Sequence, residues 1–527
     1  MKSYQKIPVD VEMVSSSHHN AAGGLECGDK ADDSGVLTEG RRKYGRAATI
    51  ASPLLFLLAL FVFVLSRGSL LTGSGANPAV QGGGDADFDA LGRYIMRNYD
   101  QAKPMSNFLS GLGGVWGVPM WAFYVNRGQG RCSFGLQNKD GAIFKFNTAE
   151  KAYQQTPFTG FRTFIKGERA ESKQCWTHMP FFPTAGADRS KNSRDMIIGM
   201  NEMEIQEVAP ELGLQTNILY FTVPDEDFPA LVRRTTFTNT DDSTDLTLDV
   251  LDGLSKLIPS GLSNGALDNM GRTMEAWMNV YNVGDGGGGK EITHPFFHIS
   301  QGTADTASVQ IIKDGHFAVA FIEGDDHDTT GPDGLMKPLP FVVDPSVVFN
   351  IDTTLTDPAG FFDPDSPDVE AIVKKPQGTT SRTPCAYAGA KLKLKPHGSV
   401  TITTIYGHAD SLESFVGRIS PKLRSQGYVE SKRKAATQLV EAITSKVATK
   451  TSSTIFDDYI KQDFLDNVLR GGMPLPLGDP ANPKVRDSCL STLLIPRALT
   501  SSSFTPLTPP PPRCTDLPHV FTHPRRH

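Results

Sequence analysis

The sequence lacks several features that would point directly to a function. It has no excess of positive charge, because 52 Lys and Arg stand against 58 Asp and Glu, for a formal net charge of −6. A protein that holds a polyanion needs a basic field, so we expect no nucleic-acid partner. Hydrophobic residues make up 39% of the 527 residues, which is ordinary globular composition and enough material for two or three domains.

Cysteines are few and widely spread. The six are Cys27, Cys132, Cys175, Cys385, Cys489 and Cys514. They form no CxxC pair and have no His partner at zinc-finger spacing, so we expect neither a disulfide framework nor a structural zinc site. Three of them fall within one expected domain, which leaves open either one bridge or buried free thiols.

Motifs for nucleotide binding and for hydrolysis are also missing. The chain contains no P-loop, no GxSxG, no HExxH and no EF-hand loop. Two Gly pairs fail the GxGxxG pattern, because Trp116 and Ser133 stand where the third Gly belongs. We therefore expect no cofactor, and we assign no catalytic residue.

Two features could hold a metal ion. The acidic stretches "EGDDHD" (323–328) and "FFDPDSPD" (361–368) are rich enough in oxygen ligands for calcium, although such loops are usually only solvated. His294 and His298 in "HPFFH" have a spacing that suits a helical metal pair, but Pro295 and the aromatic residues indicate a strand or turn. We assign no metal ligand, and a metal-dependent hydrolase would need these groups to converge.

One long hydrophobic run is present. The run "ATIASPLLFLLALFVFVLS" begins at Ala48, ends at Ser66 and contains 19 uncharged residues. At ~1.5 Å per residue it nearly crosses a ~30 Å hydrocarbon layer, so residues 48–66 are a transmembrane candidate, with a cleaved signal peptide as the alternative. Basic residues precede the run and few follow it, which predicts a single-pass type II membrane protein with a cytosolic N-terminus and a lumenal or extracellular main domain.

The segments beside this run are predicted to be flexible. Residues 1–47 mix Ser, Gly, His and charges without apolar periodicity, as in a disordered cytosolic tail. Residues 67–86 are rich in Gly, Ser and Ala and resemble a stalk. The next stretch, "DFDALGRYIMRNYD", has apolar residues at helical spacing and predicts a short amphipathic helix.

The main part of the chain predicts strands. Residues 87–407 contain alternating β-branched and aromatic runs such as "NILYFTV", "ALVRRTTFTNT", "DLTLDVLDGL" and "GSVTITTIYG". No helical pattern regularly separates them, so we expect a mainly β fold with a large antiparallel β-sandwich. "LDNMGRTMEAWMNVYN" is the helical exception. Residues 408–470 predict three linker helices, and residues 471–527 a disordered tail rich in Pro and Ser.

One stretch near the start of this domain is suited to sugar binding. Sugar rings stack on aromatic faces, and their hydroxyl groups pair with planar amides, carboxylates and guanidinium groups. The candidate substrate-binding residues are Trp116, Trp121, Tyr124, Asn126, Arg127, Gln129, Asn138 and Asp140. The alternative is a buried aromatic strand with a hairpin turn at 126–130.

Several longer segments carry a family resemblance. "GVWGVPMWAFYVNRGQGRCSFGLQNKDGAIFKFNTAEKAYQQTPFTGFRTF", "LYFTVPDEDFPALVRRTTFTNT" and "LDVLDGLSKLIPSGL" resemble the N-terminal half of cellobiose-phosphorylase-like proteins. This family is glycoside hydrolase family 94, formerly grouped with glycosyltransferase family 36. The resemblance implies a sandwich of the galactose-mutarotase type, linker helices, an (α/α)6 barrel with the active site, a β-glucoside substrate and a homodimer. Phosphate would cleave the glycosidic bond by inversion, with a barrel Asp as general acid.

The chain departs from this pattern where the barrel should begin. Only 57 residues follow Arg470, and their composition is wrong for a barrel, which we interpret as a truncated or misread gene model. The resulting hypothesis is a membrane-anchored, carbohydrate-binding sandwich domain that is inactive as written. The alternative is a structural or adhesive membrane protein whose sandwich binds a protein partner.

Overall fold

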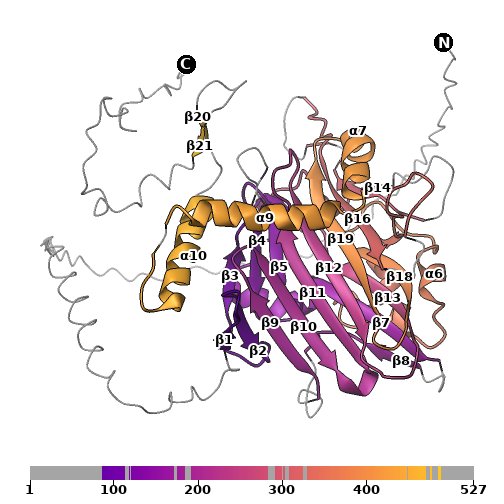
Figure 1. Cartoon of the computed structure of the whole chain (residues 1–527). Helices are drawn as coiled ribbons and strands as arrows, with labels where there is room; N and C mark the ends of the chain where they lie inside the picture. The colour runs from indigo at the N-terminus through magenta and orange to yellow at the C-terminus, as the bar shows by residue number, and fades with distance from the viewer. Residues whose placement is uncertain are drawn as a thin grey trace, which may run out of the picture. The chain divides into compact units, whose positions relative to one another are not determined.

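The computed structural model describes residues 86–470, apart from 113–117, 119, 171–174, 184–190, 283–290, 300, 303–307, 325–328 and 448, together with 475–477 and 485–487 (Figure 1). The expected cytosolic tail, the hydrophobic run at 48–66, the stalk up to residue 85 and most of the C-terminal tail lie outside the described residues. Among the helices that are described, none has the length and hydrophobicity needed to cross a membrane.

The largest element is a ten-stranded sheet in which every neighbouring pair of strands is antiparallel. The strands, in spatial order, are β1 (Ala86–Phe88), β2 (Tyr94–Arg97), β9 (Ser193–Ile198), β10 (Glu202–Ala209), β11 (Leu214–Thr222), β12 (Ala230–Asn239), β19 (Ser399–Ala409), β16 (Gly315–Glu323), β15 (Pro295–His298) and β14 (Asn279–Asn282). The predicted strands that begin at Asn217, Ala230 and Gly398 correspond to β11, β12 and β19.

Two further antiparallel sheets form the second layer. One has five strands: β17 (Phe341–Val342), β18 (Ala386–Leu394), β13 (Leu246–Leu254), β7 (Phe161–Arg169) and β8 (Cys175–His178). The other has four: β3 (Ser106–Leu109), β4 (Met120–Val125), β5 (Arg131–Leu136) and β6 (Gly141–Phe144). A separate short pair joins β20 (Leu475–Leu477) to β21 (Val485–Asp487).

The core lies between these layers. Along β10, residues such as Met203 and Ile205 are buried while their neighbours are half-buried, as the period of two requires. Four buried rings join the three sheets: Phe134 of β5 and Phe161 of β7 lie 6.1 and 5.2 Å from Tyr406 of β19, and Phe161 lies 5.6 Å from Tyr220 of β11. The predicted mainly β, antiparallel architecture is therefore confirmed.

Short helices cover the outer faces of the second layer. The helices α4 (Pro345–Phe349), α5 (Ala359–Phe362) and α6 (Val369–Ile372) pack on the five-stranded sheet through residues such as Phe164 and Val348. The helix α2 (Ala149–Thr159) packs on the four-stranded sheet. The predicted helical exception is α3 (Asn264–Glu275), whose Met274 is buried; η3 (Pro210–Leu212) is a single turn between β10 and β11.

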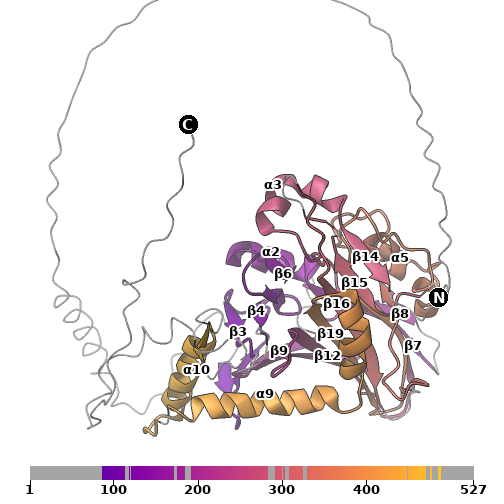
Figure 2. The same ribbon diagram turned by 90° about the horizontal axis from the view of Figure 1, so that it is seen from above.

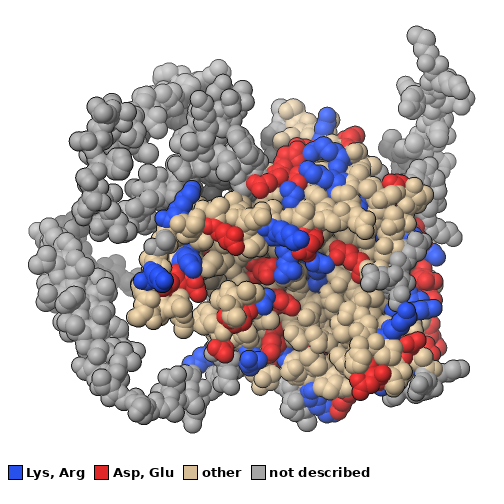
Figure 3. Space-filling view, viewed as in Figure 1, with Lys and Arg blue, Asp and Glu red and all other residues tan. Residues whose placement is uncertain are grey.

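Helices also follow the last long strand, as predicted. They are α7 (Leu412–Ser414), one π-helical turn η4 (Phe415–Ile419), α8 (Ser420–Leu423), α9 (Tyr428–Thr444) and α10 (Thr454–Arg470). Figures 1 and 2 both show α9 lying across the outer face of the ten-stranded sheet. Figure 2 shows α2 and α3 on the side of the molecule away from α9. On the face drawn in Figure 3, Lys and Arg are interspersed with Asp and Glu.

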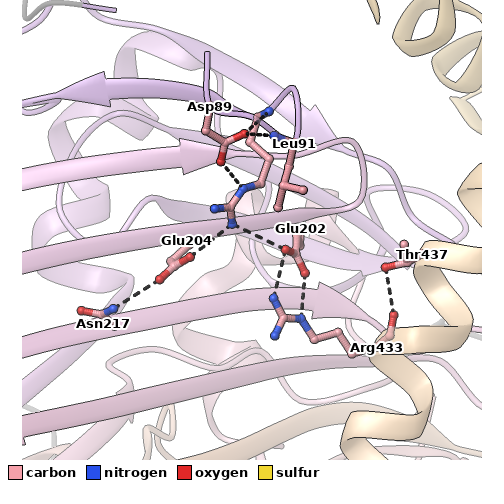
Figure 4. Close-up of polar contacts among 8 residues, drawn as sticks. Asp89, Leu91, Glu202, Glu204, Asn217, Arg433 and Thr437 are labelled. Atoms are coloured by element: carbon pink, nitrogen blue, oxygen red, sulfur yellow. Dashed lines mark hydrogen bonds and ion pairs between the residues drawn. The ribbon is translucent and has the colours of Figure 1, made fainter. Parts of the chain in front are cut away.

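A charged network fixes α9 to this sheet (Figure 4). Arg433 of α9 donates two hydrogen bonds, of 2.9 and 3.1 Å, to the carboxylate of Glu202 on β10. The guanidinium of Arg93 lies 3.9 Å from Glu202 and 3.5 Å from Glu204, and donates a 2.7 Å bond to Asp89. The bidentate geometry at Glu202 is the strongest form of such a pair.

The prediction of a helix in "DFDALGRYIMRNYD" is wrong, because this stretch contains the β1–β2 hairpin. The Asp89 carboxylate accepts 2.9 Å hydrogen bonds from the backbone N–H groups of Leu91 and Arg93, and Gly92 has a φ of 75°. An Asp that bonds to the backbone two residues on favours a turn over a helix. Pairing of β2 with β9 then completes the ladder.

Candidate functional site

The outer face of the four-stranded sheet carries an aromatic strip, defined as Phe108, Trp121, Phe123 and Phe146. Alternation along β4 sends Met120, Ala122 and Tyr124 into the core and Trp121 and Phe123 to the opposite face. The ring centroids lie 4.9 Å apart for Phe108 and Phe123, 5.6 Å for Phe123 and Phe146, and 6.0 Å for Trp121 and Phe146. Phe123 is buried, whereas the other three rings are half-buried and keep part of their surface in solvent.

The indole of Trp121 is held in one orientation. Its Nε1–H donates to the carbonyl oxygens of Leu136 and Asn138, at 3.1 and 3.2 Å. Gly135 lies beside the ring so closely that a Cβ there would come within 2.9 Å of Trp121 Cζ2. The absence of a side chain at Gly135 therefore lets the indole lie against the strand.

Polar groups adjoin the strip at the β5–β6 turn. Asn138 Oδ1 accepts a 2.9 Å hydrogen bond from the N–H of Asp140. Asp140 Oδ1 accepts a 2.6 Å bond from the N–H of Asn264, the first residue of α3. Both side chains are exposed, so Trp121, Asn138 and Asp140 are three predicted residues that the fold brings together at the surface.

A cationic rim completes this region. Lys145, which precedes Phe146, forms an ion pair with Asp268 of α3. The hydrogen bond from Lys145, together with the charges of Lys151 and Lys139, lowers the pKa of Asp268. Ammonium, carboxylate and amide groups thus lie around half-exposed rings, which is the mixture that hydroxyl-rich ligands use.

The remaining predicted residues lie elsewhere. Trp116 is outside the described residues, and Tyr124 belongs to the core. Asn126 is fully buried, and its amide bonds to the backbone N–H of Met105 and to the carbonyls of Tyr99 and Lys103, at 2.7, 3.0 and 2.8 Å. In the same turn, Arg127 donates to the carbonyl of Ala102 at 2.9 Å, and Gly128 and Gly130 have positive φ. The turn at 126–130 therefore fastens the segment before β3.

Gln129 belongs to a buried network that the sequence analysis missed. Its Oε1 accepts a 2.6 Å hydrogen bond from Arg233, and its Nε2 donates a 2.9 Å bond to Thr163. Arg233 also pairs with Asp252, which accepts further bonds from Thr163 and Thr235 at 2.6 and 2.9 Å. Burial by itself would lower the pKa of Arg233, but the Asp252 charge raises it above its ordinary value. Arg233 lies an even number of residues from Leu231 and Phe237, so the alternation of β12 places all three side chains on the inward face. This alternation is the sequence feature that indicated a buried arginine.

The two features that could have held a metal ion, the histidine pair and the acidic stretches, form no metal site among the described residues. His298 ends β15, and His294 lies in a bend just before this strand, so the two are not on a helix, as Pro295 indicated. In the second acidic stretch, Asp368 caps α6 by accepting from Ala371 N–H at 3.0 Å; the first stretch is described only to Gly324. Within the described ranges, no group of three His, Cys, Asp or Glu residues could hold a metal ion. Cys385 is a buried free thiol.

Comparisons with known proteins give weak likenesses. No family model matches the chain, and no curated protein matches it. Among solved structures it is similar to a polysaccharide lyase, with 11% identity and a TM-score of 0.26 over 60% of this chain and 34% of the lyase. It is also similar to a kojibiose phosphorylase from human microbiome, with 10% identity and a TM-score of 0.20 over 71% of this chain and 32% of the phosphorylase.

The chain therefore spans about a third of the length of these two structures. Likenesses with TM-scores this low carry no argument about its activity. Neither structure is a cellobiose phosphorylase, so the resemblance to family 94 stays a prediction.

Proposed function

We propose that this protein binds carbohydrate at the aromatic strip and its polar rim. The observation that supports the proposal is the fixed, half-exposed indole of Trp121 beside the exposed side chains of Asn138 and Asp140. A pyranose ring laid on this indole places its C–H groups on the π face, while its hydroxyl groups reach the amide and the carboxylate. Lys145, at the same rim, adds a donor.

The finer features of the proposal come from the sequence. The segments that resemble cellobiose-phosphorylase-like proteins indicate a β-glucoside as the ligand and a sandwich of the galactose-mutarotase type. The hydrophobic run at 48–66 indicates a membrane anchor with the sandwich on the lumenal or extracellular side. The proposal concerns binding by the sandwich, and it assigns no catalytic role to any residue.

The test is glycan binding by the full-length chain in detergent micelles, with cellobiose and longer β-glucans as probes. Loss of one stacked ring removes about 1.4 kcal/mol, so Trp121→Ala should weaken binding about tenfold. Asn138→Ala and Asp140→Asn should weaken it as well, without unfolding, because both side chains are exposed. Tyr281→Ala, at an exposed ring on β14, is the matched control.

Two results would contradict this proposal. One is the absence of binding to any β-glucan by the wild-type protein. The other is equal affinity for the wild type and Trp121→Ala when their melting temperatures agree.

A second candidate function, binding of a protein partner, is favoured by α10. Ile455, Phe456 and Tyr459 are 57%, 49% and 64% exposed near the start of this helix. Clustered exposed apolar side chains are typical of contact surfaces. Replacing all three by Ser should leave glycan binding unchanged and reduce association with a partner or with a second copy, which analytical ultracentrifugation of the full-length chain would measure.

A further inference from the structure

A pocket of about 410 Å³ opens beside the N-terminus of α9, on the ten-stranded sheet and away from the aromatic strip. Its apolar surface includes Phe321 of β16 and Met336, both largely buried. Its polar surface includes the carboxylates of Glu323 and Glu430 and the amide of Gln426. A pocket of this size is large enough for a small organic ligand.

One guanidinium bridges the two carboxylates. Arg234 of β12 donates a 2.7 Å hydrogen bond to Glu323 and a 3.4 Å bond to Glu430. Thr403 of β19 donates a further 2.8 Å bond to Glu323. The side chains of Glu323 and Glu430 remain 29% and 47% exposed, and each carboxylate has lone pairs left for a ligand. The pocket therefore offers fixed acceptors.

Donors lie next to Glu430, at the N-terminal end of α9. Gly427 is the residue before α9, and Val429 and Glu430 are the second and third residues of the helix. The first N–H groups of a helix have no partner within it. The N–H of Tyr428 bonds to the carbonyl of Ser425, and Gly427 has no side chain to cap the groups that follow. The exposed Gln426 amide is a further donor.

We propose that this pocket binds a polyhydroxylated ligand of monosaccharide size, at a site separate from the aromatic strip. A hydroxyl group both donates and accepts, so it matches a pocket lined by both carboxylates and N–H donors. An anion such as a phosphate would meet two carboxylates, and a simple ammonium ion would leave the donors unmatched. The C–H groups of a sugar ring would lie on Phe321 and Met336.

The experiment is a titration of the full-length chain in detergent micelles with D-glucose and with D-glucose 1-phosphate, followed by saturation-transfer NMR. D-glucose should give saturable binding and the phosphate ester should bind more weakly. Glu430→Gln should weaken glucose binding about tenfold, the loss of one charge-assisted hydrogen bond. Gln426→Trp, at an exposed position, should fill the pocket and abolish binding.

The controls separate this site from the strip. Glu441→Gln, at an exposed position further along α9, should bind glucose like the wild type. Trp121→Ala should reduce the binding of β-glucans. In the Trp121→Ala background, Glu430→Gln should still weaken glucose binding by the same factor as in the wild type. The proposal is overturned if D-glucose does not bind, if Gln426→Trp and Glu430→Gln both bind like the wild type, or if the phosphate ester binds more tightly.

Discussion

Arg233 on β12 and Asp252 on β13 form an ion pair in the interior of the sandwich, and neither side chain is exposed to solvent. Each strand belongs to a different sheet, so the pair links the two layers. Asp252 accepts from Thr163 and Thr235, and Arg233 also donates to Gln129, so the charges are surrounded by polar partners. Such a pair depends on both members, because either one alone is a buried, uncompensated charge.

The first prediction concerns this pair. Asp252→Ala should lower the free energy of unfolding by about 3–5 kcal/mol, because Arg233 is left unpaired in the core. The double replacement Arg233→Met with Asp252→Leu should recover much of that loss, since it removes both charges. Urea unfolding of the three proteins measures the effect.

A matched control is the exposed pair of Arg418 and Asp227, whose side chains are 48% and 63% exposed. Asp227→Ala should cost less than about 1 kcal/mol, as exposed ion pairs do. Equal costs for Asp252→Ala and Asp227→Ala would show that the buried pair has no special role.

The second prediction concerns Gly135 beneath the Trp121 indole. A Cβ at this position would lie 2.4 Å from the carbonyl oxygen of Gly141 and 2.9 Å from Trp121. Gly135→Ala should therefore destabilise the fold by about 1–3 kcal/mol and alter the tryptophan fluorescence. Gly265→Ala on α3 is the control, because a Cβ there meets nothing within 4 Å and alanine favours a helix. An unchanged melting temperature for Gly135→Ala would contradict the close packing.

The third prediction distinguishes a structural from a ligand-binding role for Asn126. Its amide makes three hydrogen bonds to the backbone of Tyr99, Lys103 and Met105. Asn126→Ala should lower stability by about 2–3 kcal/mol in the absence of any sugar, because buried backbone groups lose their partners. Thermal unfolding without ligand measures this. If stability is unchanged and only glycan affinity falls, the side chain contacts the ligand directly.

The sequence predicted those parts of the fold that depend on local pattern. The alternation in "ALVRRTTFTNT" and "GSVTITTIYG" located β12 and β19, and Trp121, Asn138 and Asp140 are close enough in sequence to be grouped. The β1–β2 hairpin was not predicted. The helical spacing of apolar residues here covers only a few positions, and the Asx turn at Asp89 favours a hairpin more strongly than that spacing favours a helix.

Long-range features could not be predicted in this way. Phe108 reaches the strip from β3 and Phe146 from the segment after β6, and Asp140 contacts α3 across 124 positions of sequence. The partner of Arg233 lies in another sheet, and nothing in either segment alone indicates which strands will face one another. The alternation of buried and half-buried residues along β12 does predict that Arg233 faces inward. An inward arginine needs polar partners, so the sequence indicates a buried network even though it does not identify Asp252.

The last prediction concerns pH and a pair of histidines on neighbouring strands. His316 of β16 and His408 of β19 lie opposite each other, with their Nδ1 atoms 3.2 Å apart. Asp314 lies 3.7 Å from His408, and Ser260 donates a 2.7 Å hydrogen bond to Asp314. Burial, and then the neighbouring His408, lower the pKa of His316 well below its ordinary value; burial also lowers the pKa of His408 against the opposing charges of Asp314 and Asp410.

A histidine with a lowered pKa in the folded state stays neutral while the unfolded chain takes up a proton. The contribution of this pair to stability should therefore be constant above about pH 7 and should fall as the pH drops below the unfolded pKa of about 6.5. Denaturant titrations between about pH 5 and pH 8 should show this slope for the wild type and a smaller slope for His316→Asn. His397→Asn, at an exposed site, should keep the wild-type slope. The same slope in wild type and His316→Asn would exclude the histidine pair as its source.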